Sequence, residues 1–362
     1  MLTFSKEDTK AVKGSAIMLM LYHHLFAFPD RVADDITYFS TFEISGNSIS
    51  FWIGAFGKLC VALFLFLGGY GTYITCSKSS DISKTITQRI KSLYLSYWKV
   101  FVIFIPICML MGVPRVTVNL QDLIWNFTGL KISYCGEWWF FTPYVGLLFL
   151  YPVIYKRISK ASSPYTDLFA VLLLNLVVTY ILPNINDAWT STLSDSLFWD
   201  ILFTTLKHSP SFLMGCVFAK HDIFTKLKLC LAGKLTGYLG ALLVLLLTFY
   251  MRKKVGSNMD YLLAPIYTAA LAIFMESKPG RVFHRISSRI GSESTTMWLV
   301  HSIYCYLLCQ HLVFLPKYTL LIFLWLLLLS YATAIAIRKF YALLKRAADF
   351  MHQKTNHSCE SH

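Results

Sequence analysis

Apolar stretches of similar length alternate with short polar or basic segments along almost the whole chain. Each stretch is close to the about 20 mostly apolar residues that a helix needs to cross a bilayer. The pattern therefore predicts an all-α, polytopic integral membrane bundle of about ten transmembrane helices. The expected spans are 11–28, 51–76, 93–113, 138–155, 166–183, 198–219, 235–251, 260–275, 293–312 and 318–343.

The distribution of basic residues predicts how the bundle is oriented. An even number of spans puts both termini on one side. With both termini in the cytoplasm, 23 Lys and Arg residues lie in inside segments and 7 in outside segments, as the positive-inside rule requires. We then expect a membrane-embedded domain at 1–343 and a short basic cytoplasmic tail at 344–362.

The run Arg252-Lys253-Lys254 opposes this orientation because it falls in an outside loop. Either its side chains snorkel at the membrane interface, or the seventh and eighth spans are misplaced. Moving this loop to the inside would make the other loops disagree with the positive-inside rule, so the snorkelling interpretation is preferred.

Composition excludes a soluble domain. Hydrophobic residues make up 56% of the chain and charged residues 14%, with a mean hydropathy of +0.55, whereas soluble domains are roughly 25% charged. The net charge of +14 predicts no nucleic-acid partner, because the bases lie between apolar runs where they set topology. The nine cysteines fit small packing residues, and without a second ligand pair near Cys305 and Cys309 no metal is expected.

The first span carries the sharpest chemical candidate, Lys13 followed by His23 and His24. At about 100° and 1.5 Å per residue, Lys13 and His24 share nearly one helix face, with His24 roughly 16 Å deeper. A rim cation can hold the phosphates of an anionic donor, and a deeper neutral imidazole can take a proton from a hydroxyl. The alternative is a hydrogen-bonded histidine pair without a catalytic role, and the residues leave both open. Only one of the two adjacent histidines is expected to face a given pocket.

Other polar residues inside or beside the spans are weaker candidates. Arg89 and Lys91 begin the third span, where they serve as inside anchors or as an anion site. Glu137 opens the fourth span, where a helix N-terminus favours its charge, and Trp138 follows it in an aromatic cluster typical of an interface. His301 in the ninth span is either a catalytic group or a hydrogen-bonding residue of the bundle.

The order of these motifs resembles that of acyltransferase family 3, bacterial membrane proteins that O-acylate sugars and polysaccharides. The resemblance covers about residues 10–343. Its landmarks are the basic residue, ten others and histidine of Lys13–His24, Leu63–Tyr70 at the end of the second span, Arg89–Tyr94, Glu137–Phe140, Phe212–Gly215 and Trp298–His301.

The chain departs from the family pattern at four places. Lys13 replaces the usual Arg, which keeps the charge but loses the planar fork. Ala11-Val12 fill the space where an acidic residue is often found. Ser92 stands where a second Arg is common, and Ser302 where a Pro is frequent.

The resemblance implies an O-acyltransferase with an acyl-CoA donor, most often acetyl-CoA, and a sugar hydroxyl acceptor on a lipid-linked or extracytoplasmic glycan. It implies that His24 is the catalytic base or acyl-transfer residue, with His23 as a fallback. Lys13 and Arg89, with Lys91, are implied to hold the CoA phosphates. It places the protein in the bacterial cytoplasmic membrane, with the lipid bilayer and glycan-assembly enzymes as partners.

Two other functions fit the sequence. Many apolar helices with buried polar groups also suit a glycan or lipid transporter or flippase, although no matching halves with broken helices are visible. A non-catalytic subunit of a glycan-assembly complex is the third interpretation. Acyl-CoA binding would separate the enzyme from the transporter.

Overall fold

A computed structural model describes residues 4–40, 42–44, 46–186, 196–231 and 235–359, with side chains described as far as residue 350. The structure is almost entirely helical. Its helices are α1 (Lys6–Phe26), α2 (Ile49–Gly57), α3 (Leu59–Cys76), α4 (Ile82–Leu110), α5 (Leu120–Thr128), α6 (Phe141–Ile158), α7 (Pro164–Leu176), α9 (Leu197–Lys220), α10 (Ile223–Leu231), α11 (Leu235–Val255), α12 (Asp260–Phe274), α13 (Lys278–Ser292), α14 (Ser294–Ser302), α15 (Gln310–Phe314) and α16 (Thr319–Cys359).

Short elements complete the fold. Strands β1 (Glu43–Ile44) and β2 (Asn47–Ser48) form an antiparallel hairpin in which Glu43 pairs with Ser48. Tight helical segments are η1 (Pro29–Arg31), η2 (Gly136–Phe140) and η4 (Gly256–Met259), and π-helical segments are η3 (Val177–Ile181) and η5 (Ile303–Leu308).

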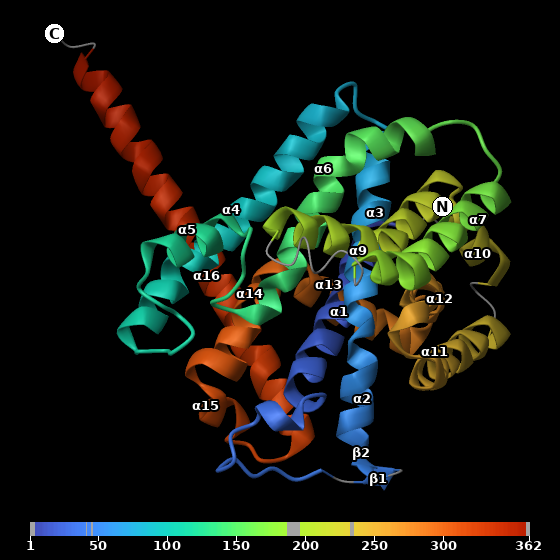
Figure 1. The fold of residues 1–362 in the computed structure, drawn as a ribbon, viewed down its shortest axis with the longest axis horizontal. Helices are drawn as coiled ribbons and strands as arrows, with labels where there is room; N and C mark the ends of the chain where they lie inside the picture. Colours follow the sequence, from blue (N-terminus) through green and yellow to red (C-terminus); the bar gives the residue numbers. More distant parts are fainter. Residues whose placement is uncertain (1–3, 41, 45, 187–195, 232–234, 360–362) are drawn as a thin grey trace.

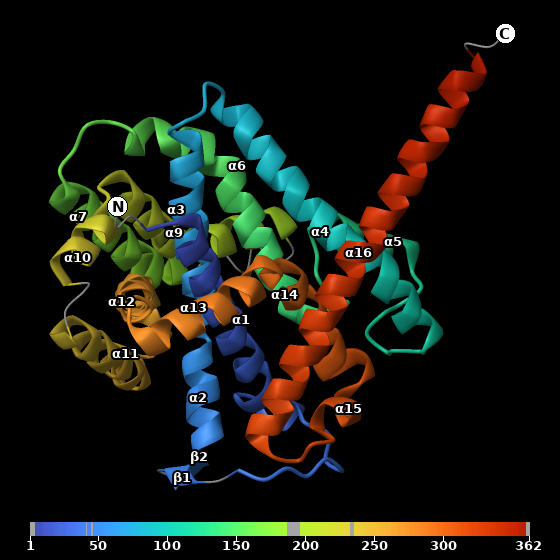
Figure 2. The same cartoon turned by 180° about the vertical axis from the view of Figure 1, so that it is seen from behind.

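The helices surround a central pair. Figures 1 and 2 show α1 and α3 in the middle of the molecule, with α11 and α12 on one side and α4, α5 and α16 on the other. The C-terminal part of α16 extends away from the body of the bundle (Figure 1). The helix runs without a break through the expected domain boundary at residue 343, and the end of the expected tail, 360–362, lies outside the described residues.

The membrane-protein fold class is confirmed. Among the described residues, six helical segments are long and apolar enough to cross a membrane by length and composition. They are Ile49–Cys76, Ile82–Leu110, Gly136–Ile158, Pro164–Asn186, Leu235–Phe274 and Thr319–Phe350. The 40-residue segment Leu235–Phe274 contains two expected spans, because η4 divides it into α11 and α12, which pack against each other.

The remaining expected spans are helical but less apolar or shorter. They correspond to α1, to α9 and to α14 with η5 and α15. Most side chains of α1 and of the C-terminal half of α9 are buried by other helices. Because protein rather than lipid covers them, such helices tolerate polar residues that a lipid-facing helix excludes. The total of ten spans and the cytoplasmic termini stay predictions.

Glycines let the inner helices approach each other closely. A Cβ on Gly69 of α3 would lie 1.9 Å from the Phe212 carbonyl oxygen of α9, and one on Gly215 of α9 would lie 1.9 Å from the Phe66 oxygen of α3. Small residues at crossings are how helices pack in a membrane. Two of the family-like landmarks of the sequence are therefore the two sides of one helix crossing.

Buried charges anchor the start of α1. Lys228 of α10 lies 3.0 Å from Asp8 and 2.9 Å from Glu276, and His284 of α13 lies 3.1 Å from Asp8. Burial opposes ionisation of Asp8, but the Ser5 backbone N–H and the Lys228 charge outweigh it, so the pKa of Asp8 is held below its ordinary value. The cluster fixes the end of the helix that carries Lys13.

The structure explains the basic run at the end of α11. Arg252 is buried and forms two bonds with Asp260, Nε–Oδ1 at 2.9 Å and Nη2–Oδ2 at 3.1 Å. The snorkelling interpretation is therefore wrong for Arg252. The Lys253 ammonium lies 3.9 Å from the ring centre of Trp52 in α2, close to the β1–β2 hairpin. The run Arg252-Lys253-Lys254 therefore lies at the end of the bundle where the expected topology places an outside loop.

Candidate active site

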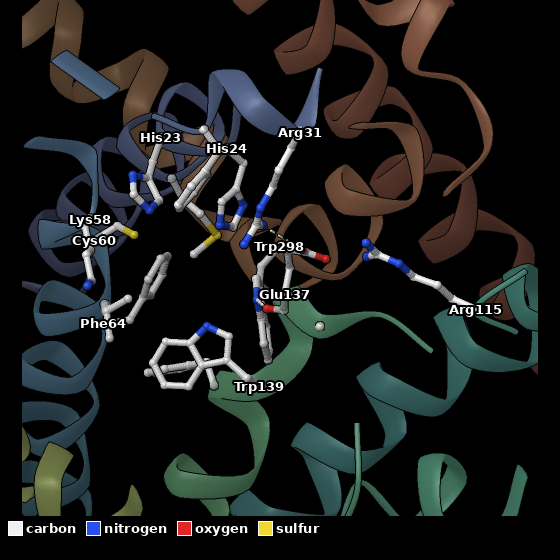
Figure 3. Close-up of a pocket in the computed structure, with 15 residues that line it drawn as sticks. His23, His24, Arg31, Lys58, Cys60, Phe64, Arg115, Glu137, Trp139 and Trp298 are labelled. Carbon is white, nitrogen blue, oxygen red and sulfur yellow. Dashed lines mark hydrogen bonds and ion pairs between the residues drawn. The ribbon is translucent and has the colours of Figure 1, made fainter. Parts of the chain in front are cut away.

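A cavity of about 460 Å³ opens between the C-terminal end of α1, the junction of α2 and α3, η2 and α14. Its volume is in the range of ligand-binding pockets. Figure 3 shows the imidazoles of His23 and His24 on one side, with Trp139 across from them and Lys58 and Arg115 at opposite ends. Both histidines line this cavity, so the expectation that only one of them could do so is wrong. The cavity extends around the end of α1 far enough to contact both the His23 and the His24 side chain.

A chain of two histidines fixes the proton positions at His24. The Nδ1 of His301 lies 2.6 Å from the carbonyl oxygen of Trp298 and can only donate to it. The neutral His301 ring therefore has an acceptor at Nε2, which lies 2.5 Å from the Nδ1 of His24. His24 then donates from Nδ1, and its Nε2 carries a lone pair that has no hydrogen-bond partner among the described residues. In this arrangement the lone pair of His24 Nε2 is available to accept a proton, and the bond to His301 fixes the orientation of the His24 ring.

His23 is held by a different partner. Its Nδ1 donates to the carbonyl oxygen of Gly54 in α2, 2.8 Å away, so its Nε2 is also an acceptor. The His23 side chain is buried, whereas His24 is half-buried. His24, which has the larger exposure and an ionisable partner, is the better placed of the two to meet a substrate.

Close packing of α1 on α2 sets these positions. A Cβ on Gly57 would lie 2.3 Å from the Leu19 carbonyl oxygen and 3.0 Å from the His23 Cβ. A Cβ on Gly54 would lie 2.9 Å from the Ala27 backbone nitrogen. Glycine at both positions lets α2 support the turn of α1 that carries the histidines.

The opposite wall is built from η2 and α14, which bind each other through their indoles. Trp138 donates from Nε1 to the Leu299 carbonyl oxygen at 2.8 Å, and Trp298 donates to the Glu137 carbonyl oxygen at 3.2 Å. Trp138 is fully buried and its side chain packs in the core. The structure gives this expected candidate a supporting role, while its neighbour Trp139 lines the cavity.

Glu137 borders the cavity as half of an ion pair. Its Oε1 lies 3.1 Å from the Nη1 of Arg31, which follows α1. The Arg31 guanidinium also lies 4.2 Å from the ring centre of Phe28, and it is close enough to His24 for the two to interact electrostatically. The Arg31 guanidinium thus lies beside His24, with its charge balanced by Glu137 and with further N–H groups that can donate hydrogen bonds.

Lys13 lines a narrow cavity that adjoins the His24 cavity. This cavity is narrow, about 80 Å³, and lies between α1, α3, α4, α6 and α14. The side chains that border both cavities are Met20, Phe64, Phe140 and Trp298. The expected stacking of Lys13 below His24 is therefore found, with an apolar constriction between the two.

The two bases of the third span have different surroundings. Arg89 donates from Nη1 to the Gly71 carbonyl oxygen at 3.2 Å and to the Thr75 hydroxyl at 3.1 Å. It is close enough to Lys13 for their charges to interact. Lys91 is exposed. The structure brings Lys13 and Arg89 together and leaves Lys91 at the surface.

Sequence reasoning missed several cavity residues, above all Lys58. It is the single residue between α2 and α3, and it stands inside an apolar stretch, where a charge marks a functional candidate. That signal was available. Arg31 and Arg115 had none, because only the tertiary fold brings their loops to α1. Trp139 belongs to the landmark Glu137–Phe140, but nothing in the sequence singles it out from its neighbours.

The fold is that of a multi-pass helical membrane protein, and its candidate site is an internal cavity lined by two histidines. Residues 9–339 match the family model described as an acyltransferase domain, so the chain belongs to acyltransferase family 3 and is a membrane acyltransferase. This confirms the family expected from the sequence. No curated protein and no solved structure matches the chain.

Proposed function

We propose that this protein is an O-acyltransferase of the bacterial cytoplasmic membrane that moves an acyl group, most often acetyl, from acyl-CoA to a hydroxyl of a cell-surface or lipid-linked glycan. One observation carries the proposal. The free Nε2 of His24 belongs to a ring that lines a ligand-sized cavity, and Lys13 lines the adjoining narrow one. A base and a cation are thus available at the two ends of one path.

The narrow cavity suits the donor. A volume of about 80 Å³ is too small for a nucleotide but fits part of a thin, flexible pantetheine arm. The nucleotide stays outside, where Lys13 and Arg89 offer their charges to its phosphates and Lys91 adds a further charge at the surface. The thioester passes the constriction of Met20, Phe64, Phe140 and Trp298 to reach His24.

The chemistry follows from the tautomer of His24. Its Nε2 takes the proton of the acceptor hydroxyl as the oxygen attacks the thioester carbonyl carbon. The tetrahedral intermediate collapses by breaking the C–S bond, and the CoA thiolate takes the proton from the imidazolium. The products are the acyl ester and free CoA. The bond from His24 Nδ1 to His301 keeps the ring oriented and stabilises the imidazolium during the cycle.

Arg31 is the group best placed to stabilise the oxyanion of the intermediate. Its guanidinium interacts electrostatically with His24 and is oriented by Glu137. Donors that are fixed before the reaction stabilise developing charge most effectively. The Glu137 pair therefore has a catalytic purpose, because it keeps Arg31 at the cavity.

The test is acceptor-dependent release of CoA by the purified protein. Acetyl-CoA is mixed with bacterial surface oligosaccharides, free thiol is followed, and the acceptor is analysed by mass spectrometry for added acetyl groups. We expect release that requires an acceptor, with Arg31→Met slower than wild type by about 10²-fold. Arg157→Met is the matched control, because Arg157 is exposed in the last turn of α6 and lines neither the His24 cavity nor the narrow one. Substrate uptake without CoA release would support a transporter instead.

A further inference from the structure

A second polar cavity lies beside the His24 cavity. Its volume is about 430 Å³, and it is bounded by α3, by α7 with the π-helical segment η3, by α9 and by η4 with α12. It shares Lys58, Val61 and Trp139 with the His24 cavity. π-helical segments are frequent at functional sites. Nothing in the acyl-transfer scheme above uses this space.

The charges that face this second cavity have a positive excess. Lys58 and Lys207 border it, together with one carboxylate, Asp260. Asp260 is already bound in bidentate fashion by Arg252. In the described part of the chain, no carboxylate lies within ion-pairing distance of the Lys58 or Lys207 ammonium. The Lys207 ammonium lies 6.0 Å from the centre of the Phe203 ring.

Lys58 connects the two cavities electrostatically. Its ammonium interacts with His23 on one side and with His208 and Asp260 on the other. It lies nine residues beyond the start of the apolar segment Ile49–Cys76, roughly 14 Å along a helix. A charge at such depth is costly unless water or an opposite charge compensates it.

Neutral groups in the second cavity suit a sugar. His208 donates from Nδ1 to the Thr204 carbonyl oxygen at 2.8 Å, so its Nε2 is free to accept a hydroxyl proton in a hydrogen bond. The Asn175 amide also borders the cavity. Trp139 borders both cavities, is 38% exposed and packs 5.1 Å from the His208 ring, centre to centre, so part of its indole is available to stack on a sugar ring.

We propose that the second cavity is the acceptor subsite and that it binds a sugar carrying a negatively charged group, a phosphate or a carboxylate, through Lys58 and Lys207. The sugar lies along Trp139, and the hydroxyl to be acylated projects past Lys58 toward His24. This proposal rests on the proposed function, because it names the class of acceptor for the same reaction. Two sources share the chemistry, a polyprenyl-phosphate-linked sugar and a glycan containing a uronic or other acidic sugar.

The test separates binding of the acceptor from the chemical step. Lys58→Met, Lys58→Arg and wild type are purified, and steady-state CoA release is measured with three acceptors of matched length. These are a neutral oligosaccharide, the same oligosaccharide with a glucuronic acid residue, and the same oligosaccharide joined to a short-chain polyprenyl diphosphate. Lys78→Met is the matched control, because Lys78 is an exposed lysine in the turn that follows the far end of the same helical segment.

The charged acceptor should react best, and Lys58→Met should raise its KM by about tenfold or more. The KM for acetyl-CoA should stay unchanged, Lys58→Arg should restore most of the loss, and Lys78→Met should behave as wild type. The charged acceptor whose KM rises in Lys58→Met shows whether the natural acceptor is an acidic glycan or a polyprenyl-phosphate-linked sugar. A neutral acceptor that reacts as well as both charged ones, with Lys58→Met silent, overturns the subsite.

A readout without turnover keeps the two proposals apart. The melting temperature of the detergent-purified protein is measured with glucuronic acid and with inorganic pyrophosphate as probes. One probe should stabilise wild type and Lys78→Met but not Lys58→Met. If no CoA is released with any acceptor while this pattern holds, the acyltransferase proposal fails and the anion site stands. If CoA is released but neither probe discriminates the variants, the anion site fails.

Discussion

At the scale of single residues, His24 depends on a partner 277 positions away in the sequence. A histidine whose Nδ1 has no acceptor can adopt either neutral tautomer, so only part of its population presents a basic Nε2 to the cavity. His301 removes that freedom, because its own Nδ1 is committed to the Trp298 carbonyl oxygen. The ring of His301 does not line the His24 cavity, so the proposed mechanism gives His301 the task of orienting His24 and not of contacting the substrate.

Replacement of His301 tests this dependence. His301→Leu should lower kcat by about 10²-fold, because the preferred tautomer and the stabilised imidazolium are both lost. The KM values for donor and acceptor should change little. His301→Gln supplies an amide oxygen as acceptor and should recover part of the rate. Kinetics of CoA release measure all three proteins, and an equal rise in both KM values would point to a collapsed cavity instead.

The sequence predicts part of the site and misses the rest for a physical reason. The spacing of Lys13 and His24 is a local property of one helix, so their stacked arrangement can be predicted. The bond from His24 to His301, the pairing of Glu137 with Arg31 and the position of Trp139 arise from contacts between distant segments. A single sequence contains no periodicity that reports such contacts.

At the scale of elements, the site depends on how α1 lies on the broken helix α2–α3. The sequence shows one continuous apolar stretch there, but Lys58 ends α2 and α3 begins directly after it. The backbone N–H of Lys58 bonds to the Ala55 oxygen at 3.4 Å, a tight turn in place of regular helix. Hydropathy is averaged over a window longer than such a break. It therefore predicts the span Ile49–Cys76 but not the turn at Lys58.

Gly57→Ala tests the docking of α1 on this turn. The added Cβ would lie 2.3 Å from the Leu19 oxygen, so α1 must shift, which costs about 1–3 kcal/mol of stability. A displacement of about 1 Å at the histidines lowers turnover by about 10²-fold. Gly240→Ala in α11 is the control, because nothing lies within 4 Å of its added Cβ. Thermal unfolding and CoA release together show whether activity falls further than stability.

At the scale of the whole molecule, the cavities give the bundle two distinct ends. Lys13, Arg89 and the buried Asp8–Lys228 cluster lie toward one end, and the β1–β2 hairpin, Trp52 and Arg252 lie toward the other. The basic residues of the sequence predict that the first end faces the cytoplasm. The donor would then enter from the cytoplasm, while the acceptor subsite lies at the membrane depth of Lys58.

Labelling of single cysteines tests this orientation. With Cys359, the exposed Cys230 and the half-buried Cys309 replaced by serine, Asn47→Cys in the hairpin should react with a membrane-impermeant maleimide in intact spheroplasts. Ser80→Cys, in the turn between α3 and α4, should react only after the membrane is permeabilised. The reverse pattern would place the Lys13 end outside and would contradict a cytoplasmic acyl-CoA donor.

The overall fold was easier to predict than its inner helices. Lipid-facing helices such as α16 must be apolar, so their sequences reveal them. α1 and α9 are covered by protein, and their Asp, Lys and His residues weaken the hydropathy signal exactly where the cavities form. The helices that hydropathy defines least well are thus the ones that carry the chemistry.

The most direct measurement is acceptor-dependent CoA release by His24→Ala and His23→Ala, purified and assayed beside wild type. A base in contact with the acceptor should contribute about 10²–10⁴-fold, so His24→Ala should be almost inactive while its melting temperature stays near that of wild type. His23→Ala should keep a measurable rate, because its ring supports α2 through Gly54 and is not the base. Wild-type turnover by His24→Ala would contradict the account.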